Sequence, residues 1–332
     1  MDFTRQRQEL TKQVINIENN DFETIAMSLF HFQYRYNTLY QSFVDCLNVN
    51  IANVSSLQDI PFLPVSFFKT HTVKSGNFDA KVVFSSSGTT GQQTSKHHLS
   101  DTQVYDQISL SAFSRFYGSV SDYCFLALLP SYLERPDSSL VHMCSNFISQ
   151  SKCSQSGFFL NDMDRLLETI EKLRRKEIPT VLIGVSYALL DLADHYHPDL
   201  KGIIVMETGG MKGRRAEMTK EAMHKHLKSS FNLSEIHSEY GMTELLSQAY
   251  SKGAGVFFAA PTMKVMTAET TDPRTVQKTG KAGIVQIVDL ANIDSCAFIA
   301  TEDLGICYEN GGFEIIGRQD NSDIRGCNLM VE

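Results

Sequence analysis

A loop rich in hydroxyl groups is the first stretch of the sequence that could do chemistry. Residues 85–100, SSSGTTGQQTSKHHLS, follow the apolar run KVVF and combine many serines and threonines with two glycines and a single lysine. Glycine lets the backbone turn so that several N–H groups point at one anion, and hydroxyl groups add donors without bulk. The loop could therefore hold a phosphate group, or it could be a polar surface loop, the usual context of such a composition.

The spacing within this loop argues against a phosphate loop of the Walker type. That motif places four residues between its first glycine and a Gly-Lys-Ser/Thr triplet. Here Gly91 is followed by two glutamines. Hydrolysis of the kinase or GTPase type is therefore disfavoured.

The histidines and cysteines do not have the spacing of a zinc site. The histidines at 97–98, 195–197 and 224–226 are adjacent or two apart, so on a helix they point to different sides, and no cysteine lies near them. The seven cysteines show no C-x-x-C spacing. We expect reduced thiols, most of them buried.

Composition and charge exclude several classes of protein. A chain of 332 residues with 42% apolar and 20% charged residues can bury a large core, which excludes a disordered chain and a mini-protein held by disulfides. The formal charge of −8 repels nucleic acid. The start MDFTRQRQEL lacks a signal-peptide pattern and no apolar run is long enough to span a bilayer, so we expect a cytoplasmic protein without a membrane span.

The order of the elements predicts an α/β fold. The apolar run 81–84 is expected to be a strand that leads through the serine loop into a helix, with Ser100 and Gln103 as its capping box. Expected helices at 161–176, 187–196 and 216–231 alternate with strands at 179–185, 201–208 and 234–241, typical of a mostly parallel sheet covered on both faces. Ligands of such sheets bind beyond the carboxyl ends of the strands.

The expected organisation has four parts. A helical segment at 1–60, with Leu39, Phe43 and Cys46 among its inward candidates, packs on an α/β core at 61–255. A smaller β unit, largely antiparallel, occupies 256–316, because apolar alternation continues there without helical stretches. A hinge and a short tail make up 317–332.

Four motifs in order resemble those of the adenylate-forming superfamily, which includes acyl- and aryl-CoA synthetases, luciferases and adenylation domains. They are SSSGTTG at 85–91, SEYGMTE at 238–244, TEDLG at 301–305, with Glu302 where glycine is usual, and GRQD at 317–320. The resemblance narrows over four further stretches, IPFLPVSFFKTH, LPSYLERPDSSLVHM, ETGGMKGRR and SDIRGCNLMVE. These are similar to the acyl-protein synthetases of bacterial bioluminescence systems, from about residue 55 to the C-terminus.

This resemblance implies ATP-dependent activation of a fatty or other carboxylic acid as acyl-AMP, with Mg²⁺, followed by transfer to a thiol. It also implies the residues that bind the nucleotide. Thr243 would donate to the α-phosphate and Glu244 would hold Mg²⁺. The phosphate loop would wrap the β- and γ-phosphates with Ser86, Ser87, Gly88, Thr89, Thr90 and Gly91. The nucleoside would contact Gly209, Gly210, Tyr240, Gly241, Asp303 and Arg318.

The acid substrate requires an apolar slot beside these groups. Its candidates are Leu129, Tyr132, Leu133 and Met242. Phe67 and Phe68 are considered as well, but ordinary core packing is the preferred interpretation for both. Glu134 and Arg135 are expected to form an ion pair that shapes the loop. An acyl-accepting protein is a further expected partner.

The superfamily continues beyond the hinge with a lid domain that carries a catalytic lysine, whereas this sequence ends fourteen residues after Arg318. We therefore expect no lid domain, and another cation in place of the catalytic lysine. Lys69, Lys96, Lys212 and Arg214 are the candidates, with Lys212 preferred because it follows the glycine turn expected at the nucleotide.

Cys327 matches the position at which the bioluminescence synthetases carry their acyl group. Arg325, two residues earlier, would favour its thiolate form. A free thiol near the C-terminus is the alternative. Two other functions stay open: an enzyme that passes the adenylate to CoA, an amine or a sugar, and a nucleotide-binding scaffold without turnover.

Overall fold

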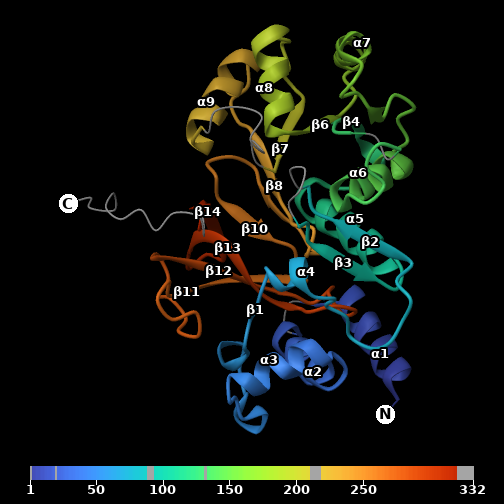
Figure 1. Ribbon diagram of the computed structural model, residues 1–332. Coiled ribbons are helices and arrows are strands. Elements are labelled where there is room, and N and C mark those ends of the chain that lie inside the picture. The colour runs from blue at the N-terminus through green and yellow to red at the C-terminus, as the bar shows by residue number, and fades with distance from the viewer. Residues whose placement is uncertain (1, 19–20, 88–92, 131–132, 210–217, 320–332) are drawn as a thin grey trace, which may run out of the picture.

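One large sheet forms the centre of the molecule. The structure, a computed structural model, describes residues 2–18, 21–87, 93–130, 133–209 and 218–319. Across these ranges the strands form a twelve-stranded sheet, in which eleven follow the order β11-β12-β13-β14-β10-β9-β8-β7-β6-β4-β5 and β1 pairs with β13, and a separate two-stranded sheet of β2 and β3. Figure 1 shows the strands running through the middle of the molecule, with α1–α3 at one end and α7–α9 at the other.

The parallel part of this sheet confirms the predicted α/β fold. Its parallel strands are β4 (Cys124–Leu128), β5 (Gly157–Phe158), β6 (Thr180–Val185), β7 (Ile204–Thr208) and β8 (His237–Tyr240). Every residue of β4 and β6 is buried, as expected of strands covered on both faces. The helices around them are α5 (Gln103–Tyr117), α6 (Ser139–Gln150), α7 (Met163–Arg175), α8 (Ser186–His195) and α9 (Lys220–Phe231).

The strands predicted after residue 256 are present and antiparallel. They are β10 (Phe257–Ala259), β11 (Met263–Ala268), β12 (Ala282–Asp289), β13 (Phe298–Cys307) and β14 (Gly312–Arg318). β9 (Ala249–Ser251) pairs with both β8 and β10 and so joins these strands to the parallel part in one hydrogen-bonded sheet. The division into a core and a smaller β unit stays a prediction.

The N-terminal segment is helical and packs against the antiparallel strands. Its helices are α1 (Phe3–Ile15), α2 (Phe22–Tyr36) and α3 (Thr38–Cys46). Gln33 donates to the carbonyl oxygen of Asn292 at 2.7 Å, and the ring of Tyr40 stacks on Phe298. The expected inward position of Cys46 is wrong, because its side chain is exposed while Tyr40 and Val44 of the same helix are buried. Leu39 and Phe43 are half-buried.

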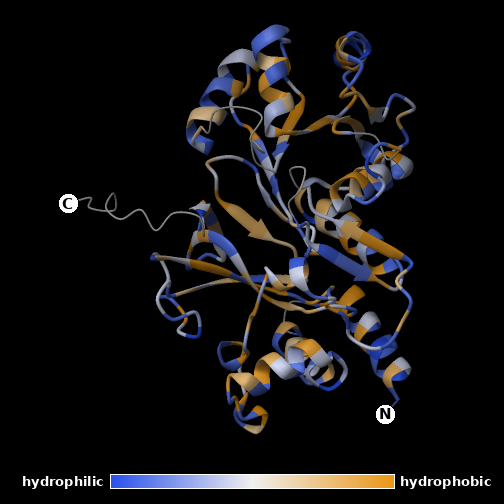
Figure 2. Ribbon diagram, viewed as in Figure 1, coloured by the Kyte–Doolittle hydropathy of each residue, from blue (hydrophilic) through white to orange (hydrophobic). Residues whose placement is uncertain are grey.

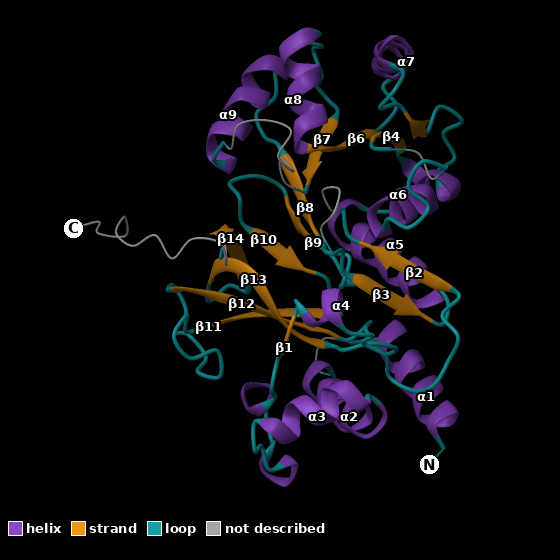
Figure 3. Ribbon diagram, in the orientation of Figure 1, coloured by secondary structure: helices purple, strands orange, loops and turns teal. Residues whose placement is uncertain are grey.

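The serine loop is attached differently from the prediction. β2 (Val82–Ser85) pairs antiparallel with β3 (Lys96–Leu99), so the loop connects two strands of a hairpin instead of leading from the parallel sheet into a helix. The predicted capping box is also wrong, because α5 begins after Thr102 and the Ser100 hydroxyl lies 2.5 Å from the Asp294 carboxylate. Figure 3 shows this hairpin beside α5.

Smaller elements complete the fold. β1 (Leu63–Pro64) runs parallel to β13, and α4 (Phe67–Thr70) follows it. Short 3-10 turns are present at Ile51–Asn53, Leu57–Asp59 and Val120–Asp122. Figure 2 shows apolar residues concentrated on the central strands, while the outer helices also carry hydrophilic stretches. In the part of the chain that the structure describes, every helix is too short or too polar to cross a bilayer.

Candidate active site

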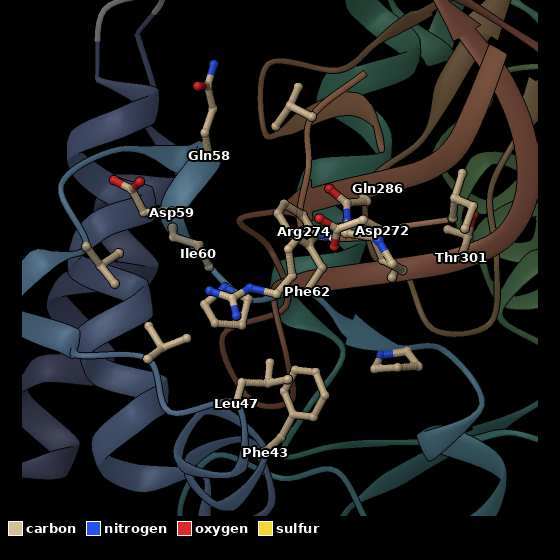
Figure 4. A pocket seen from close by; sticks show the side chains of 18 of the residues that line it. Phe43, Leu47, Gln58, Asp59, Ile60, Phe62, Asp272, Arg274, Gln286 and Thr301 are labelled. Carbon is tan, nitrogen blue, oxygen red and sulfur yellow. Dashed lines mark hydrogen bonds between the residues drawn. The ribbon is translucent and has the colours of Figure 1, made fainter. Parts of the chain in front are cut away.

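Two cavities compete for the role of functional site. The larger has a volume of about 1040 Å³ and the smaller about 580 Å³. Figure 4 shows the larger one, with Phe43 and Leu47 on one side and Gln286 and Thr301 on the other.

The predicted motif residues gather at the smaller cavity. Among the described residues, its lining includes Ser86, Ser87, Gly209, Gly241, Met242, Thr243, Glu244 and Arg318. None of the predicted site residues that the structure describes lines the larger cavity. We take the smaller cavity as the candidate site, because its residue types carry the chemistry and its volume lies in the range of small-molecule sites.

The turn that follows β8 is held rigidly by groups behind it. His97 of β3 is fully buried, and its Nδ1 lies 2.9 Å from the carbonyl oxygen of Thr243. Since a carbonyl oxygen only accepts, Nδ1 carries the proton and Nε2 accepts from the Ser295 hydroxyl at 2.9 Å. Burial lowers the pKa of His97 to about 4, so the ring stays neutral. Asn292 adds a bond to the carbonyl oxygen of Glu244 at 2.7 Å.

Asp289 fixes the next part of the same segment. Its buried carboxylate accepts from the backbone N–H of Leu246 at 2.7 Å, of Ser247 at 3.0 Å and of Ala291 at 3.1 Å, and from the Ser247 hydroxyl at 2.6 Å. Burial raises the pKa of Asp289, while these bonds favour its ionised form. The segment 241–248 therefore faces the cavity from a preorganised backbone.

Tyr240 and Asp303 are joined to each other beside the cavity and do not line it. The Tyr240 hydroxyl donates to Oδ2 of Asp303 at 2.8 Å, and the tyrosine ring packs against Phe257 and Phe313. Burial raises the pKa of Asp303. Asp303 stands opposite Arg318 in the pairing of β13 with β14. Asp303 and Arg318, both predicted to contact the nucleoside, are thus neighbours in the sheet.

Glu302, which replaces the usual glycine of the motif, organises two cations. Its carboxylate lies 2.9 Å from Nη2 of Arg318 and 3.6 Å from Nζ of Lys69. Both cations line the cavity. Lys69 is thus the described lysine that reaches the site, whereas Lys96 is exposed on β3 and Lys212 lies outside the described residues.

Glu244 fits the role of a magnesium ligand that is shared with phosphates. It lines the cavity and is buried, and burial raises its pKa while Ser95, Lys69 and Arg318 act in the opposite direction. Among the described residues there is no group of three or more His, Cys, Asp or Glu side chains that could hold a metal. Mg²⁺ is commonly bound by one or two carboxylates together with substrate phosphates, which needs no such group.

Several predicted substrate contacts are not brought to the cavity. Leu129 is buried in the core, and Leu133 is 93% exposed. Phe68 is a core residue, as the preferred interpretation had it. Arg135 lines the cavity and pairs with Asp137 at 3.0 Å instead of the expected Glu134, which accepts from Asn161.

The remaining predicted residues lie outside the described part of the chain. They are Gly88, Thr89, Thr90, Gly91, Tyr132, Gly210, Lys212, Arg214, Arg325 and Cys327.

Glu239 is the main site residue that the sequence did not reveal. It lines the cavity, is 7% exposed, and accepts from the Thr208 hydroxyl. Burial raises its pKa to about 7. The alternation of side chains along a strand could have revealed it. Glu239 and Gly241 are two residues apart where β8 leads into the turn, so they face the same side of the strand. Further described residues of the lining include Ser95, Tyr105, Leu140, Met143 and Gln248.

Solved structures with this fold are adenylate-forming enzymes. A 2-hydroxyisobutyryl-CoA ligase in complex with 2-HIB-AMP and CoA superposes with a TM-score of 0.66 at 10% sequence identity. The match covers 97% of this chain and 70% of the ligase chain. ATP-bound MatB from Rhodopseudomonas palustris matches 72% and 48% with a TM-score of 0.53 at 17% identity. The luciferase-like enzyme from the nonluminescent Zophobas morio mealworm matches 74% and 59% with a TM-score of 0.52 at 17% identity.

These likenesses establish the fold, which is that of the N-terminal core of the adenylate-forming enzymes. The match spans about half the length of MatB. No protein of curated function matches the sequence. The family model described as "Acyl-protein synthetase, LuxE" matches residues 140–332, more than half of the chain, and the chain belongs to that family. The matched stretch begins later than the predicted residue 55.

Proposed function

We propose that this chain uses ATP to activate a carboxylic acid, of the fatty type that the family resemblance implies, and then passes the acyl group to a thiol. The observation that carries the proposal is the cavity that Ser86 and Ser87 of the serine loop line together with Thr243 and Glu244. These segments are more than 150 residues apart in the sequence. Hydroxyl donors and the carboxylate of Glu244 therefore meet in one cavity, as binding of a nucleotide phosphate requires.

The first step makes the acid a better acyl donor. A carboxylate oxygen of the acid bonds to the α-phosphorus of ATP, the bond to the β-phosphate oxygen breaks, and pyrophosphate leaves. Negative charge accumulates on the α-phosphate, where Thr243 would donate a hydrogen bond. Lys69 and Arg318 would supply positive charge from the cavity wall. Mg²⁺ bound at Glu244 would neutralise phosphate charge.

The second step moves the acyl group to sulfur. The thiolate of Cys327 or of a partner attacks the acyl carbon, and the bond to the AMP oxygen breaks, so that AMP leaves with the electron pair. The thiol proton is lost to solvent before attack. An ordinary cysteine with a pKa of about 8.5 is a few per cent ionised at neutral pH, which supports a moderate rate without further activation.

Acid-dependent exchange of pyrophosphate into ATP tests the first step. Intact-mass measurement of the full chain after incubation with ATP, Mg²⁺ and fatty acids tests the second. We expect exchange in the wild type and in Cys327→Ser, and an acyl mass shift in the wild type alone. An unshifted wild-type mass with product on free CoA would identify an acyl-CoA ligase. ATP binding without exchange for any acid would identify a scaffold.

A further inference from the structure

The lining of the cavity includes a polar cluster that the proposed activation chemistry does not use. Glu239 and Thr208 are opposite each other in the pairing of β8 with β7, and the Thr208 hydroxyl donates to Oε2 of Glu239. Both residues line the cavity and both are buried. The other carboxyl oxygen of Glu239, Oε1, is not bonded to Thr208.

Glu239 differs from the acidic residue on the neighbouring strand. Glu207 is buried too, but Nζ of Lys220 lies 2.8 Å from it and His224 lies 3.5 Å from it. These partners outweigh the effect of burial and lower the pKa of Glu207. Within the described ranges, no Lys, Arg or His forms an ion pair with Glu239. Glu239 is therefore a buried carboxyl group that faces a cavity and forms no ion pair within the described part of the chain.

Gln248 supplies a second polar atom in the same place. Its side chain is 2% exposed, and its Nε2 donates to the carbonyl oxygen of Leu246 at 3.2 Å. Its Oε1 is buried and has no hydrogen-bond partner among the described residues. Leaving such an acceptor unpaired is costly, and native structures seldom do so without a reason.

Gly241 brings the two side chains together. A Cβ atom at this position would lie 2.5 Å from Oε1 of Glu239 and 3.9 Å from Cγ of Gln248. Both side chains thus lie against the Cα of Gly241, which has room for them only because it has no side chain. Leu140 and Met143 of α6 and Met242 supply the apolar part of the lining.

We propose that the acid substrate carries a hydroxyl group on its chain, and that this hydroxyl binds between the carboxyl group of Glu239 and the side-chain oxygen of Gln248. The inference rests on the proposed function and adds the substrate class, a hydroxylated carboxylic acid. A hydroxyl group both donates and accepts, so with Glu239 protonated it accepts from the carboxyl group and donates its one hydrogen to Oε1 of Gln248. An ammonium group fits only the ionised carboxylate, and a keto group cannot donate to Gln248.

An unsubstituted alkyl chain would leave these polar groups without partners after water is expelled. Sites built to bind a substrate hydroxyl discriminate strongly against analogues that lack it. With one hydrogen bond to a carboxyl group and one to an amide, we expect kcat/KM for the hydroxylated acid to exceed that for the unsubstituted acid by about tenfold or more.

The test is acid-dependent pyrophosphate exchange with the full chain over matched sets of acids. Each set has one chain length and contains the unsubstituted acid, the isomers hydroxylated at successive carbons, and the amino and keto analogues. The expected result is a preference for one hydroxylated isomer. Exchange that is equally fast or faster with the unsubstituted, amino or keto acids overturns the inference and leaves the proposed function intact. The absence of exchange with every acid overturns both.

Two variants separate recognition from a merely structural role. Glu239→Leu is expected to lose the preference and to process the unsubstituted acid at least as well as the wild type. Glu168→Gln, which removes an exposed carboxylate on α7, is the matched control and keeps the preference. If Glu239→Leu slows all acids by the same factor, Glu239 is structural and the inference fails. If Glu239→Leu does not fold, the same comparison of acids is made with Gln248→Leu. The preference of the wild type among the acids remains a test in either case.

Discussion

Replacing Glu239 by glutamine should change how stability depends on pH. Burial raises the pKa of Glu239 from 4.5 to about 7. Below about pH 4.5 the carboxyl group is protonated in both the folded and the unfolded chain. Between these values the unfolded chain releases the proton while the folded chain retains it, so the free energy of unfolding falls as pH rises, and it levels off above about pH 7. Glutamine does not titrate and removes this dependence.

The size of the effect follows from the two pKa values. One pKa unit corresponds to about 1.4 kcal/mol, so the whole shift corresponds to about 3 kcal/mol, and about 2.5 kcal/mol of it falls between pH 5 and pH 8. The lowered pKa of Glu207 acts in the opposite direction but below its ordinary value of 4.5, outside this window. Both proteins retain Glu207, so its contribution cancels in their difference.

Urea unfolding at pH 5 and pH 8 of the wild type, Glu239→Gln and the control Glu168→Gln measures this difference. The stability of Glu239→Gln relative to the wild type should rise by about 2.5 kcal/mol from the lower to the higher pH. The control should run parallel to the wild type, because its carboxylate is exposed. If Glu239→Gln also runs parallel, Glu239 is ionised in the folded protein at pH 5, and the argument from burial without a counter-ion is refuted.

Three further predictions test the surroundings of the cavity. Gly241→Ala should cost about 1–3 kcal/mol by overpacking against Glu239, and the cost should largely vanish when Glu239→Ala is added, which a double-mutant cycle of unfolding free energies measures. Additive losses would show that the two residues do not meet. Asp289→Asn should destabilise the protein by about 3 kcal/mol in urea unfolding, because an amide cannot accept all the bonds that this carboxylate holds. An unchanged midpoint would contradict that account. Tyr240→Phe should cost about 1 kcal/mol of stability and raise the KM for ATP, because Asp303 loses its donor; an unchanged KM would separate Asp303 from the nucleotide.

The parallel part of the fold could be predicted because its signal is local. Strands buried on both faces need continuous apolar runs, as in TVLIGV at β6, and the helices between them show one apolar face, as Leu166, Ile170 and Leu173 do on α7. Neither pattern depends on distant residues. The sequence therefore identified these elements and their order, with errors of a few residues at the ends.

The β2–β3 hairpin could not be predicted because its second strand has no apolar pattern. KHHL alternates between exposed and buried positions, but a histidine, His97, occupies one buried position. Burial of His97 is possible only because Thr243 and Ser295, both more than 140 residues away, bond both ring nitrogens. A contact at that distance leaves no trace in the local sequence.

Site residues that belong to a sequence motif could be predicted, whereas residues that reach the cavity only through the pairing of strands could not. Thr243 and Glu244 were named from their motif, whereas Gln248 and Thr208 lie in the cavity only because β7, β8 and β9 are neighbours in the sheet. The preference for Lys212 among the lysines stays a prediction, because this residue lies outside the described part of the chain. Lys69 reaches the cavity through Glu302, a residue that marked a departure from the superfamily pattern.

Strand β8 carries residues of both the proposed nucleoside contact and the proposed hydroxyl contact. Side chains alternate along β8, so Tyr240 points toward Asp303, while Glu239 bonds to Thr208 in the cavity lining. A shift of β8 by a fraction of an ångström would therefore move the proposed nucleoside contact and the proposed hydroxyl contact together. The anchors that act on the following turn, His97 and Asp289, resist such a shift from outside the cavity. Substitutions at either anchor should consequently weaken ATP binding and acid discrimination in parallel, whereas substitutions at Glu239 should change discrimination alone.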